Sequence, residues 1–283
     1  MNKRILALLL AALLVSSLPG CAKKAAFQEN PESDILATTQ PVYQLACALT
    51  DGTGLTVDLL ISESVSCLHD YALTVAQMEK VEQSTLVLES GLGLEDFMED
   101  ALAGKTRIDI SAGLDTLSSD EGIDPHWWLD PTCFRQAART AAMELGMQYP
   151  EFADQISANL EAFEQKLSDL QDYGASVLAD LPCKELVTFH DGFSYFADSF
   201  GLHIAAAMEV ESGSEPSAKE LEAIIAIVEE NRIPAVFYET NGESGSAEVV
   251  AAETGCSVWT LDMAISNGDY FDAMHENIDI VKE

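Results

Sequence analysis

The chain has 283 residues, with 14 lysines and arginines against 48 aspartates and glutamates, which gives a formal net charge of −34 at pH 7. A chain this acidic repels a phosphate backbone, so the composition excludes nucleic-acid binding. The acidic residues are spread along the whole sequence, which predicts a well-solvated surface with a modest attraction for cations.

The first twenty residues predict a secretory signal peptide. Lys3 and Arg4 precede the apolar run ILALLLAALLV, which is too short to span a bilayer comfortably. Residues 18–21, LPGC, resemble a bacterial lipobox, in which Cys21 becomes the lipid-bearing first residue of the mature protein. Residues 21–33 are mostly polar and unpatterned, and they predict a lipidated tether. We therefore expect an extracytoplasmic lipoprotein that is anchored to the membrane by its lipid.

Strand-like and helical patterns alternate from residue 34 to residue 149. Apolar, β-rich runs occupy residues 35–39, 55–61, 85–90 and 107–111, and helical patterns lie between them. This alternation predicts a parallel sheet whose ligands bind at the carboxyl ends of its strands. We interpret residues 34–149 as an N-terminal α/β lobe.

A long amphipathic helix is predicted from Pro150 to about Ala179, within a linking segment of residues 150–182. Apolar residues recur there at spacings of mostly three and four, with a proline in the first turn and another beyond the end. A helix of roughly 30 residues is about 45 Å long at 1.5 Å per residue. We expect it to be a rigid connection between two lobes.

The strand and helix alternation resumes from residue 183 to residue 283. Strand-like runs occupy residues 186–190, 203–209, 235–239 and 257–261. Ser217, with Glu220 three residues on, predicts a capping box at a helix start. We interpret this segment as a C-terminal α/β lobe, with a ligand site in the cleft between lobes. The predicted fold class is α/β, with two α/β lobes joined by one long rigid helix.

Four potential metal ligands fall at strand ends or in loops beside the predicted cleft. His69 follows the strand-like run 55–61, and His126 stands in the stiff stretch DPHWWLDP. His190 ends the run LVTFH, and Asp262 follows the run SVWTL. A lone histidine is more often a core residue with one hydrogen bond, but three neutral imidazoles and a carboxylate suit tetrahedral Zn²⁺. The sequence therefore predicts a metal site between the lobes.

The other histidines and the cysteines are less informative. We expect His203 and His275 to be structural or exposed. Cys67 stands two residues before His69, and its participation as a thiolate ligand is left open. The cysteines beyond Cys21 are odd in number and widely spaced, which predicts mostly free thiols and at most one or two disulfides.

Several sequence motifs resemble a known family. The stretches LHDYALTVAQ, DPHWWLDP, VTFHDGFSYFADSFGL, SEPS and LDMA followed by GDYFDAM occur in order between about residue 34 and residue 283. They resemble the ZnuA-like solute-binding proteins, which are zinc- and manganese-binding lipoproteins that serve as extracytoplasmic receptors for metal ABC importers. The resemblance implies two α/β lobes, a long rigid helix, and metal held between the lobes by His69, His126, His190 and Asp262.

The resemblance also implies a function. The protein would capture a divalent metal and deliver it to the permease of an ABC importer in the membrane, and we expect it to be a monomer. Manganese members of the family typically have glutamate where this chain has His190, and imidazole ligands favour zinc, so we expect Zn²⁺ rather than Mn²⁺. Two departures from the family pattern are a first histidine loop without its usual prolines and the absence of a His-rich acidic loop.

Three alternative functions are compatible with the sequence. One is a Mn²⁺ receptor of the same family, and another is a surface adhesin, which rests on analogy alone. The third is a zinc hydrolase, which is disfavoured because Asp262 fills the fourth coordination position and no glutamate is spaced to act as a base. We therefore expect a binding protein and not an enzyme.

Metal-binding imidazoles need a second hydrogen-bond partner that fixes their orientation. Asp124, Asp130 and Asp191 are candidates for this role because they lie near His126 and His190 in sequence. Binding should weaken as the pH falls through about 6, since protonated histidine cannot bind a metal.

Overall fold

The computed structural model describes residues 33–62, 71–119, 122–208, 216–265 and 268–283. Within it, Pro31–Glu283 forms one compact unit. The predicted signal peptide, Cys21, Cys67 and His69 lie outside the described residues.

The first sheet has four parallel strands in the order β2-β1-β3-β4. The two central strands are buried along their whole length, which explains their continuous apolar sequence. The strands are β1 (Ile35–Ala37), β2 (Val57–Leu59), β3 (Leu86–Glu89) and β4 (Thr106–Asp109). The helical elements between them are α2 (Gln40–Thr50), α3 (Val75–Gln83), η1 (Asp96–Met98) and α4 (Glu99–Leu102).

A connecting region leads from the first sheet to the long helix. Two short antiparallel strands, β5 (Ser118–Ser119) and β6 (Gly122–Ile123), precede the 3-10 turn η2 (Trp127–Leu129). Helix α5 (Pro131–Gln148) then begins at a proline, and its N-cap residue Asp130 accepts a hydrogen bond from the backbone of Thr132 at 2.6 Å. Proline suits this first position because the N–H that it lacks would have no partner within the helix.

The second sheet is also parallel, with the strand order β10-β9-β7-β8. Its strands are β7 (Glu185–Thr188), β8 (His203–Ala207), β9 (Ala235–Glu239) and β10 (Ser257–Leu261). The helical elements are η4 (Asp191–Phe193), α7 (Ser194–Ser199), α8 (Ala218–Asn231), α9 (Gly245–Thr254) and α10 (Tyr270–Lys282). The predicted capping box at Ser217 is present at the start of α8.

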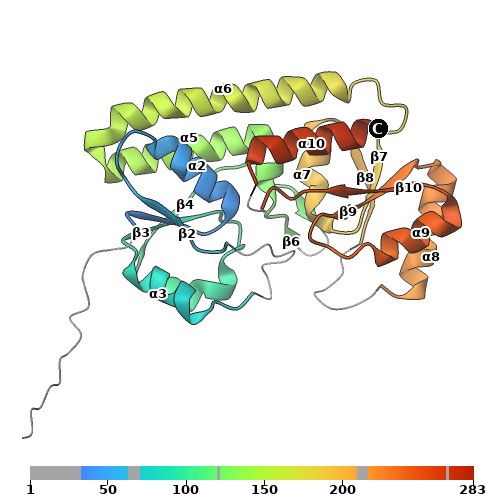
Figure 1. Ribbon diagram of the computed structural model, residues 1–283, viewed down its shortest axis with the longest axis horizontal. Helices are drawn as coiled ribbons and strands as arrows, with labels where there is room; N and C mark the ends of the chain where they lie inside the picture. The colour runs from blue at the N-terminus through green and yellow to red at the C-terminus, as the bar shows by residue number, and fades with distance from the viewer. Residues whose placement is uncertain (1–32, 63–70, 120–121, 209–215, 266–267) are drawn as a thin grey trace, which may run out of the picture. The chain divides into compact units, whose positions relative to one another are not determined.

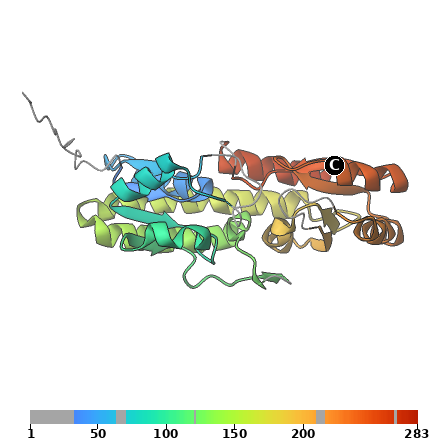
Figure 2. The same ribbon diagram turned by 90° about the horizontal axis from the view of Figure 1, so that it is seen from below.

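The predicted long helix is present in two pieces. The 3-10 turn η3 (Pro150–Phe152) leads directly into α6 (Ala153–Val177). Helix α6 contacts α2 and α5, which precede it in the chain, and α10, which follows it (Figures 1 and 2). Asn159 donates to the carbonyls of Leu49 and Asp51, where α2 ends. Nearer the end of α6, the Tyr173 hydroxyl donates to Asp279 of α10. Helix α6 therefore connects the elements around the two sheets.

A hydrophobic core extends from the first sheet to the second. One cluster of buried side chains includes β1 and β3, the buried face of α6, and residues of α7 and α10. A second, smaller cluster lies between the second sheet and the helices α8 and α9. The structure confirms the predicted α/β class, with two parallel sheets and a long helix. Among the described residues, no helix is long and apolar enough to cross a membrane.

Candidate metal centre

Three strands of the second sheet end side by side at the predicted site. Strand β9 lies between β7 and β10, and its last residue, Glu239, pairs with Leu261 of β10. Asp262 follows directly. On the other side of β9, Thr188 of β7 pairs with Phe237 of β9. Two residues further along each chain segment, His190 lies beside Glu239. Parallel order thus gathers one imidazole and two carboxylates at the same sheet edge.

His126 is held by a buried aspartate. Asp124 Oδ1 lies 2.9 Å from the backbone nitrogen of His126 and 2.8 Å from its ring nitrogen Nδ1. Asp124 is buried, and because a carboxylate only accepts, Nδ1 carries the proton. The other ring nitrogen, Nε2, is then the one suited to bind a metal. Of the predicted orienting residues, Asp124 contacts its histidine, whereas Asp130 caps α5.

The two tryptophans after His126 form hydrogen bonds to segments near the ends of β3 and β10. Trp127 Nε1 donates to the carbonyl of Ser90 at 3.0 Å, and Trp128 Nε1 donates to the carbonyl of Met263 at 2.8 Å. Both indoles are buried, and the Trp128 ring meets the His126 ring edge to face at 5.4 Å. The aromatic residues therefore fix the position of His126 and shield it from water.

His126 and His190 lie together, although 64 positions separate them in the sequence. Their ring centroids are 5.4 Å apart at an interplanar angle of 79°. Gly192 makes room for this approach. A Cβ atom on Gly192 would lie 2.9 Å from His190 Cδ2, 3.1 Å from His126 Cε1 and 2.3 Å from Met263 Cε.

Glu239 and Asp262 place two carboxyl groups beside His190. Glu239 is 2% exposed, and its Oε2 lies 4.0 Å from His190 Nδ1. Burial, and then the neighbouring Asp262, raise the pKa of Glu239 to about 8. Burial also raises the pKa of Asp262, while a hydrogen bond from the backbone of Ala264 opposes this shift.

The backbone of Asp262 is fixed by one asparagine of α10. Asn277 accepts from the Asp262 N–H at 2.8 Å and donates to the Asp262 carbonyl at 2.7 Å. The paired hydrogen bonds hold the chain where β10 ends. A change in the Asp262 side chain would therefore leave its backbone anchored.

The remaining predicted residues have different positions. His203 is exposed at the start of β8, and His275 packs edge to face on Tyr173 of α6 at 4.7 Å. Within the described ranges, no three His, Cys, Asp or Glu side chains form a group that could hold a metal ion by themselves. The predicted ligand His69 and the open candidate Cys67 lie outside those ranges.

Sequence reasoning did not find Glu239. A glutamate at the end of a strand is usually solvated, and the sequence alone does not reveal that β9 lies between β7 and β10. The signal that could have found it is its position: His190, Glu239 and Asp262 all stand at the ends of strand-like runs in the second half of the chain.

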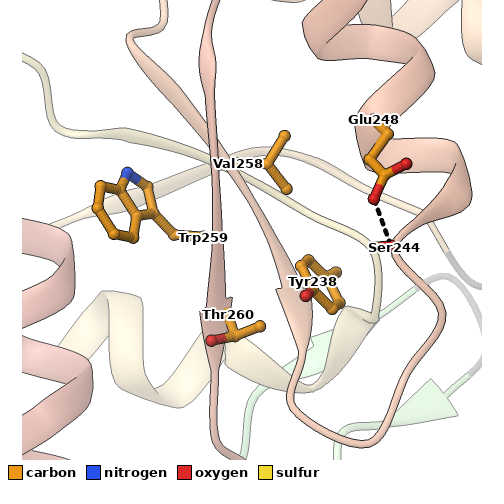
Figure 3. A pocket seen from close by; sticks show the side chains of 6 residues that line it. All are labelled: Tyr238, Ser244, Glu248, Val258, Trp259 and Thr260. Atoms are coloured by element: carbon orange, nitrogen blue, oxygen red, sulfur yellow. Dashed lines mark hydrogen bonds between the residues drawn. The ribbon is translucent and has the colours of Figure 1, made fainter.

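A hollow of about 300 Å³ lies elsewhere, over strands β9 and β10 (Figure 3). It is lined by Tyr238, Ser244, Glu248, Val258, Trp259 and Thr260. The Ser244 hydroxyl donates a hydrogen bond to Glu248 at 2.7 Å. None of the predicted metal ligands contributes to it. The hollow is therefore separate from the candidate metal centre.

Comparison with known proteins gives a family match over nearly all of the described chain. The family profile described as "Zinc-uptake complex component A periplasmic" matches residues 35–283. The chain is 25% identical over 225 residues to the manganese-binding lipoprotein MntA of Halalkalibacterium halodurans, covering 75% of each chain. It is 23% identical over 304 residues to the high-affinity zinc uptake system protein ZnuA of Bacillus subtilis, covering 98% of this chain and 93% of that protein.

Solved structures agree with the family match. The chain is similar to a crystal structure of ZnuA, with a TM-score of 0.79 and 30% identity over 88% of this chain and 98% of that one. It is also similar to a laminin-binding adhesin, Lmb, of Streptococcus agalactiae, with a TM-score of 0.79 and 22% identity over the same shares of the two chains. At 22% identity, the second likeness concerns the fold alone.

Proposed function

Because the chain belongs to the family of zinc-uptake complex component A proteins, we propose that it is the receptor of a metal ABC importer. It captures one divalent cation outside the cytoplasm and delivers it to a permease in the membrane. The family takes up metal and does not convert a substrate, so the protein is not an enzyme.

The observation that carries this proposal is the meeting of His126 and His190. The two rings approach to 5.4 Å from distant parts of the sequence, and a buried carboxylate lies beside each of them. We propose that His126, His190 and Asp262 bind the metal together with His69. Three imidazoles and one carboxylate match zinc in ligand number and type.

Zinc is the proposed cargo, and manganese is the alternative. Manganese prefers oxygen ligands, whereas this ligand set is rich in nitrogen. The names of the relatives include both metals, zinc for ZnuA and manganese for MntA. The second carboxylate, Glu239, adds oxygen to the surroundings of the site, so a direct comparison of the two metals is part of the test.

The mechanism follows from how the ligands are supported. The proposed lobes are residues 34–149 and 183–283, and residues 150–182 connect them. Helix α6 packs against α2, α5 and α10, which opposes a wide hinge motion. Metal capture then requires only a local movement of the ligand side chains and their loops, and the permease must reverse that movement to release the metal.

We further propose that the protein works at the membrane surface as a lipoprotein. Residues 1–20 direct export, Cys21 carries the lipid, and residues 21–33 are the tether. The relative MntA is named a lipoprotein, which supports this assignment. We propose that the protein acts as a monomer. Adhesion to host matrix, the alternative, has support only from the shared fold of Lmb.

The test is metal binding by the full chain, purified in detergent and freed of metal by chelation. Titration calorimetry and thermal unfolding with Zn²⁺ and with Mn²⁺ should give one zinc per chain and tighter binding of zinc. Zinc at 1,000 times the dissociation constant should stabilise the protein by about 4 kcal/mol. This effect should be lost in His126→Ala and in His190→Ala.

The matched control is His203→Ala, which removes an exposed histidine of the same sheet. It should bind zinc like the unmodified protein. If neither His126→Ala nor His190→Ala changes zinc binding, the proposed site is wrong. If the unmodified protein binds neither zinc nor manganese, the proposed function is wrong.

A further inference from the structure

Glu239 differs from the other glutamate that ends a central strand. Glu89 ends β3 in the first sheet and is 4% exposed, and Glu239 ends β9 in the second sheet and is 2% exposed. Arg107 donates to both carboxylate oxygens of Glu89, at 2.9 and 3.1 Å. Glu239 has no lysine or arginine partner among the described residues, where its Oε2 lies 4.0 Å from Nδ1 of His190.

Burying a carboxylate without a cation is costly, because the protein interior does not replace the water that solvated it. Glu239 Oε1 is buried and has no hydrogen-bond partner in the described part of the chain. Its neighbours on the same sheet edge are His190 and Asp262, one of which is another acid. The site therefore places two carboxyl groups side by side, and a bound cation would compensate the negative charge of both.

The arrangement resembles the one at His126, with a longer distance between carboxylate and ring. There, Asp124 Oδ1 contacts Nδ1 of the imidazole, and the second oxygen, Oδ2, is buried without a hydrogen bond in the described residues. At His190, Glu239 Oε2 is the carboxylate oxygen near Nδ1, at 4.0 Å. In both cases the carboxylate lies on the Nδ1 side of the ring, which leaves Nε2 as the nitrogen for a metal.

We propose that Glu239 is the positioning residue of His190. When zinc binds, Glu239 accepts a hydrogen bond from Nδ1–H of His190, which turns Nε2 toward the metal. Its negative charge joins that of Asp262 in balancing the divalent cation. This inference rests on the proposed function, and it assigns Glu239 a role beside the metal rather than a bond to it.

The test compares zinc affinity in Glu239→Gln, Glu239→Ala and the control Glu89→Gln, each as the full chain in detergent. A competing chromophoric chelator reports the dissociation constant. Loss of a carboxylate that orients a metal-binding histidine typically weakens affinity by about 10- to 100-fold, which we expect for Glu239→Ala. Glu239→Gln keeps an oxygen acceptor and should lose less. Glu89→Gln should stay within about twofold of the unmodified protein, because its partner is Arg107 and not a metal ligand.

Two spectroscopic measurements separate this role from a structural one. Nitrogen-15 NMR of the histidine rings in the zinc-loaded protein should show His190 bound through Nε2, with a protected Nδ1–H whose exchange with water is faster in Glu239→Ala. The absorption spectrum of the Co²⁺-loaded protein should keep its coordination number in Glu239→Gln. A changed coordination number would overturn the inference by making Glu239 a direct ligand.

The outcomes also separate this inference from the proposed function. If the unmodified protein binds zinc, His126→Ala abolishes binding, and Glu239→Ala binds as tightly as before, only the inference about Glu239 fails. If the unmodified protein binds neither zinc nor manganese, both fail. Thermal unfolding of each variant without metal identifies a variant that has lost its fold, and the isosteric Glu239→Gln decides the question if Glu239→Ala does not fold.

Discussion

At the scale of single residues, the candidate site depends on close approach. His126 and His190 meet because Gly192 has no side chain at the point where their rings and the end of Met263 converge. The hydrogen bond from His126 to Asp124 then fixes which ring nitrogen is presented. Each of these features is a contact between particular atoms, so single substitutions can test them.

Gly192→Ala should weaken zinc binding by about tenfold or more, in the range typical of changes to residues that position metal ligands. The added methyl group would overlap Met263 Cε and press on both imidazole rings. Overpacking of this kind should also cost about 1–3 kcal/mol of folding stability. Titration calorimetry and urea unfolding would measure the two effects. Gly245→Ala is the control, because no atom lies within 4 Å of its added Cβ; equal zinc affinity in the two variants would contradict the prediction.

Glu95 predicts a pH dependence of stability that does not involve the metal site. Burial raises the pKa of Glu95 to about 7 from an ordinary value of 4.5, although Thr38, Ser90 and Gly91 all donate hydrogen bonds to it. The folded protein therefore retains this proton up to about pH 7, whereas the unfolded chain loses it near pH 4.5. The contribution to stability is full below about pH 4.5 and is lost as the pH rises to about 7.

The free energy of unfolding, measured in urea at pH 5 and at pH 7.5, should reveal this contribution. Between pH 5 and pH 7.5, the free energy of unfolding of the unmodified protein should fall by on the order of 2–3 kcal/mol more than that of Glu95→Gln. This follows from the raised pKa, since each pKa unit corresponds to about 1.36 kcal/mol. Glu239 adds a slope of the same sign, because its pKa is raised to about 8, so some dependence should persist in the variant. Identical slopes in the two proteins would mean that Glu95 is ionised across this range.

At the scale of elements, the sequence predicts whether a segment is a helix or a strand better than it predicts which strands lie side by side. The apolar run at 85–90 and the three-and-four spacing after Pro150 depend on local patterns, and they appear as β3 and as η3 with α6. The order of strands in a sheet depends on long-range packing, which no local pattern encodes. For that reason His190, Glu239 and Asp262 could each be assigned to the end of a strand-like run, but the place of Glu239 between the other two could not be predicted. The loop of His69 lies outside the described residues, so its place in the site stays a prediction.

Helix α6 should contribute to stability through its buried face. Leu167 lies in the middle of α6 and is fully buried in the larger hydrophobic cluster. Leu167→Ala should lower the free energy of unfolding by about 2–5 kcal/mol, because it removes apolar contacts and leaves a cavity. Glu161→Ala changes an exposed residue of the same helix and should cost far less. Urea unfolding monitored by circular dichroism would measure both, and a loss below 1 kcal/mol for Leu167→Ala would show that α6 is not part of the cooperative core.

At the scale of the whole molecule, one large hydrophobic cluster spans both sheets. The larger hydrophobic cluster contains residues from Ile35 of β1 to Val281 of α10, and Trp128 and Tyr270 add hydrogen bonds between distant parts of the chain. Shared burial couples the two halves, since exposing one half would expose part of the core of the other. The larger hydrophobic cluster is therefore common to both halves of the chain.

This shared core predicts a single unfolding transition for the metal-free protein. Far-ultraviolet circular dichroism, which reports the helices, and near-ultraviolet circular dichroism, which reports aromatic packing, should give the same urea midpoint. Two separate midpoints would mean that the smaller cluster around α8 and α9, which lies only in the second half, unfolds independently.

The edge-to-face contact between Trp128 and His126 places a fluorescent side chain against a proposed metal ligand. The indole is 1% exposed and its ring centroid lies 5.4 Å from that of the imidazole, so we expect its emission to change when a metal binds to His126. Trp127 is equally shielded, and Trp259, on the second sheet, is 37% exposed and emits as a separate, solvent-sensitive background. Intrinsic fluorescence should therefore report metal capture in real time, without a dye attached to the protein.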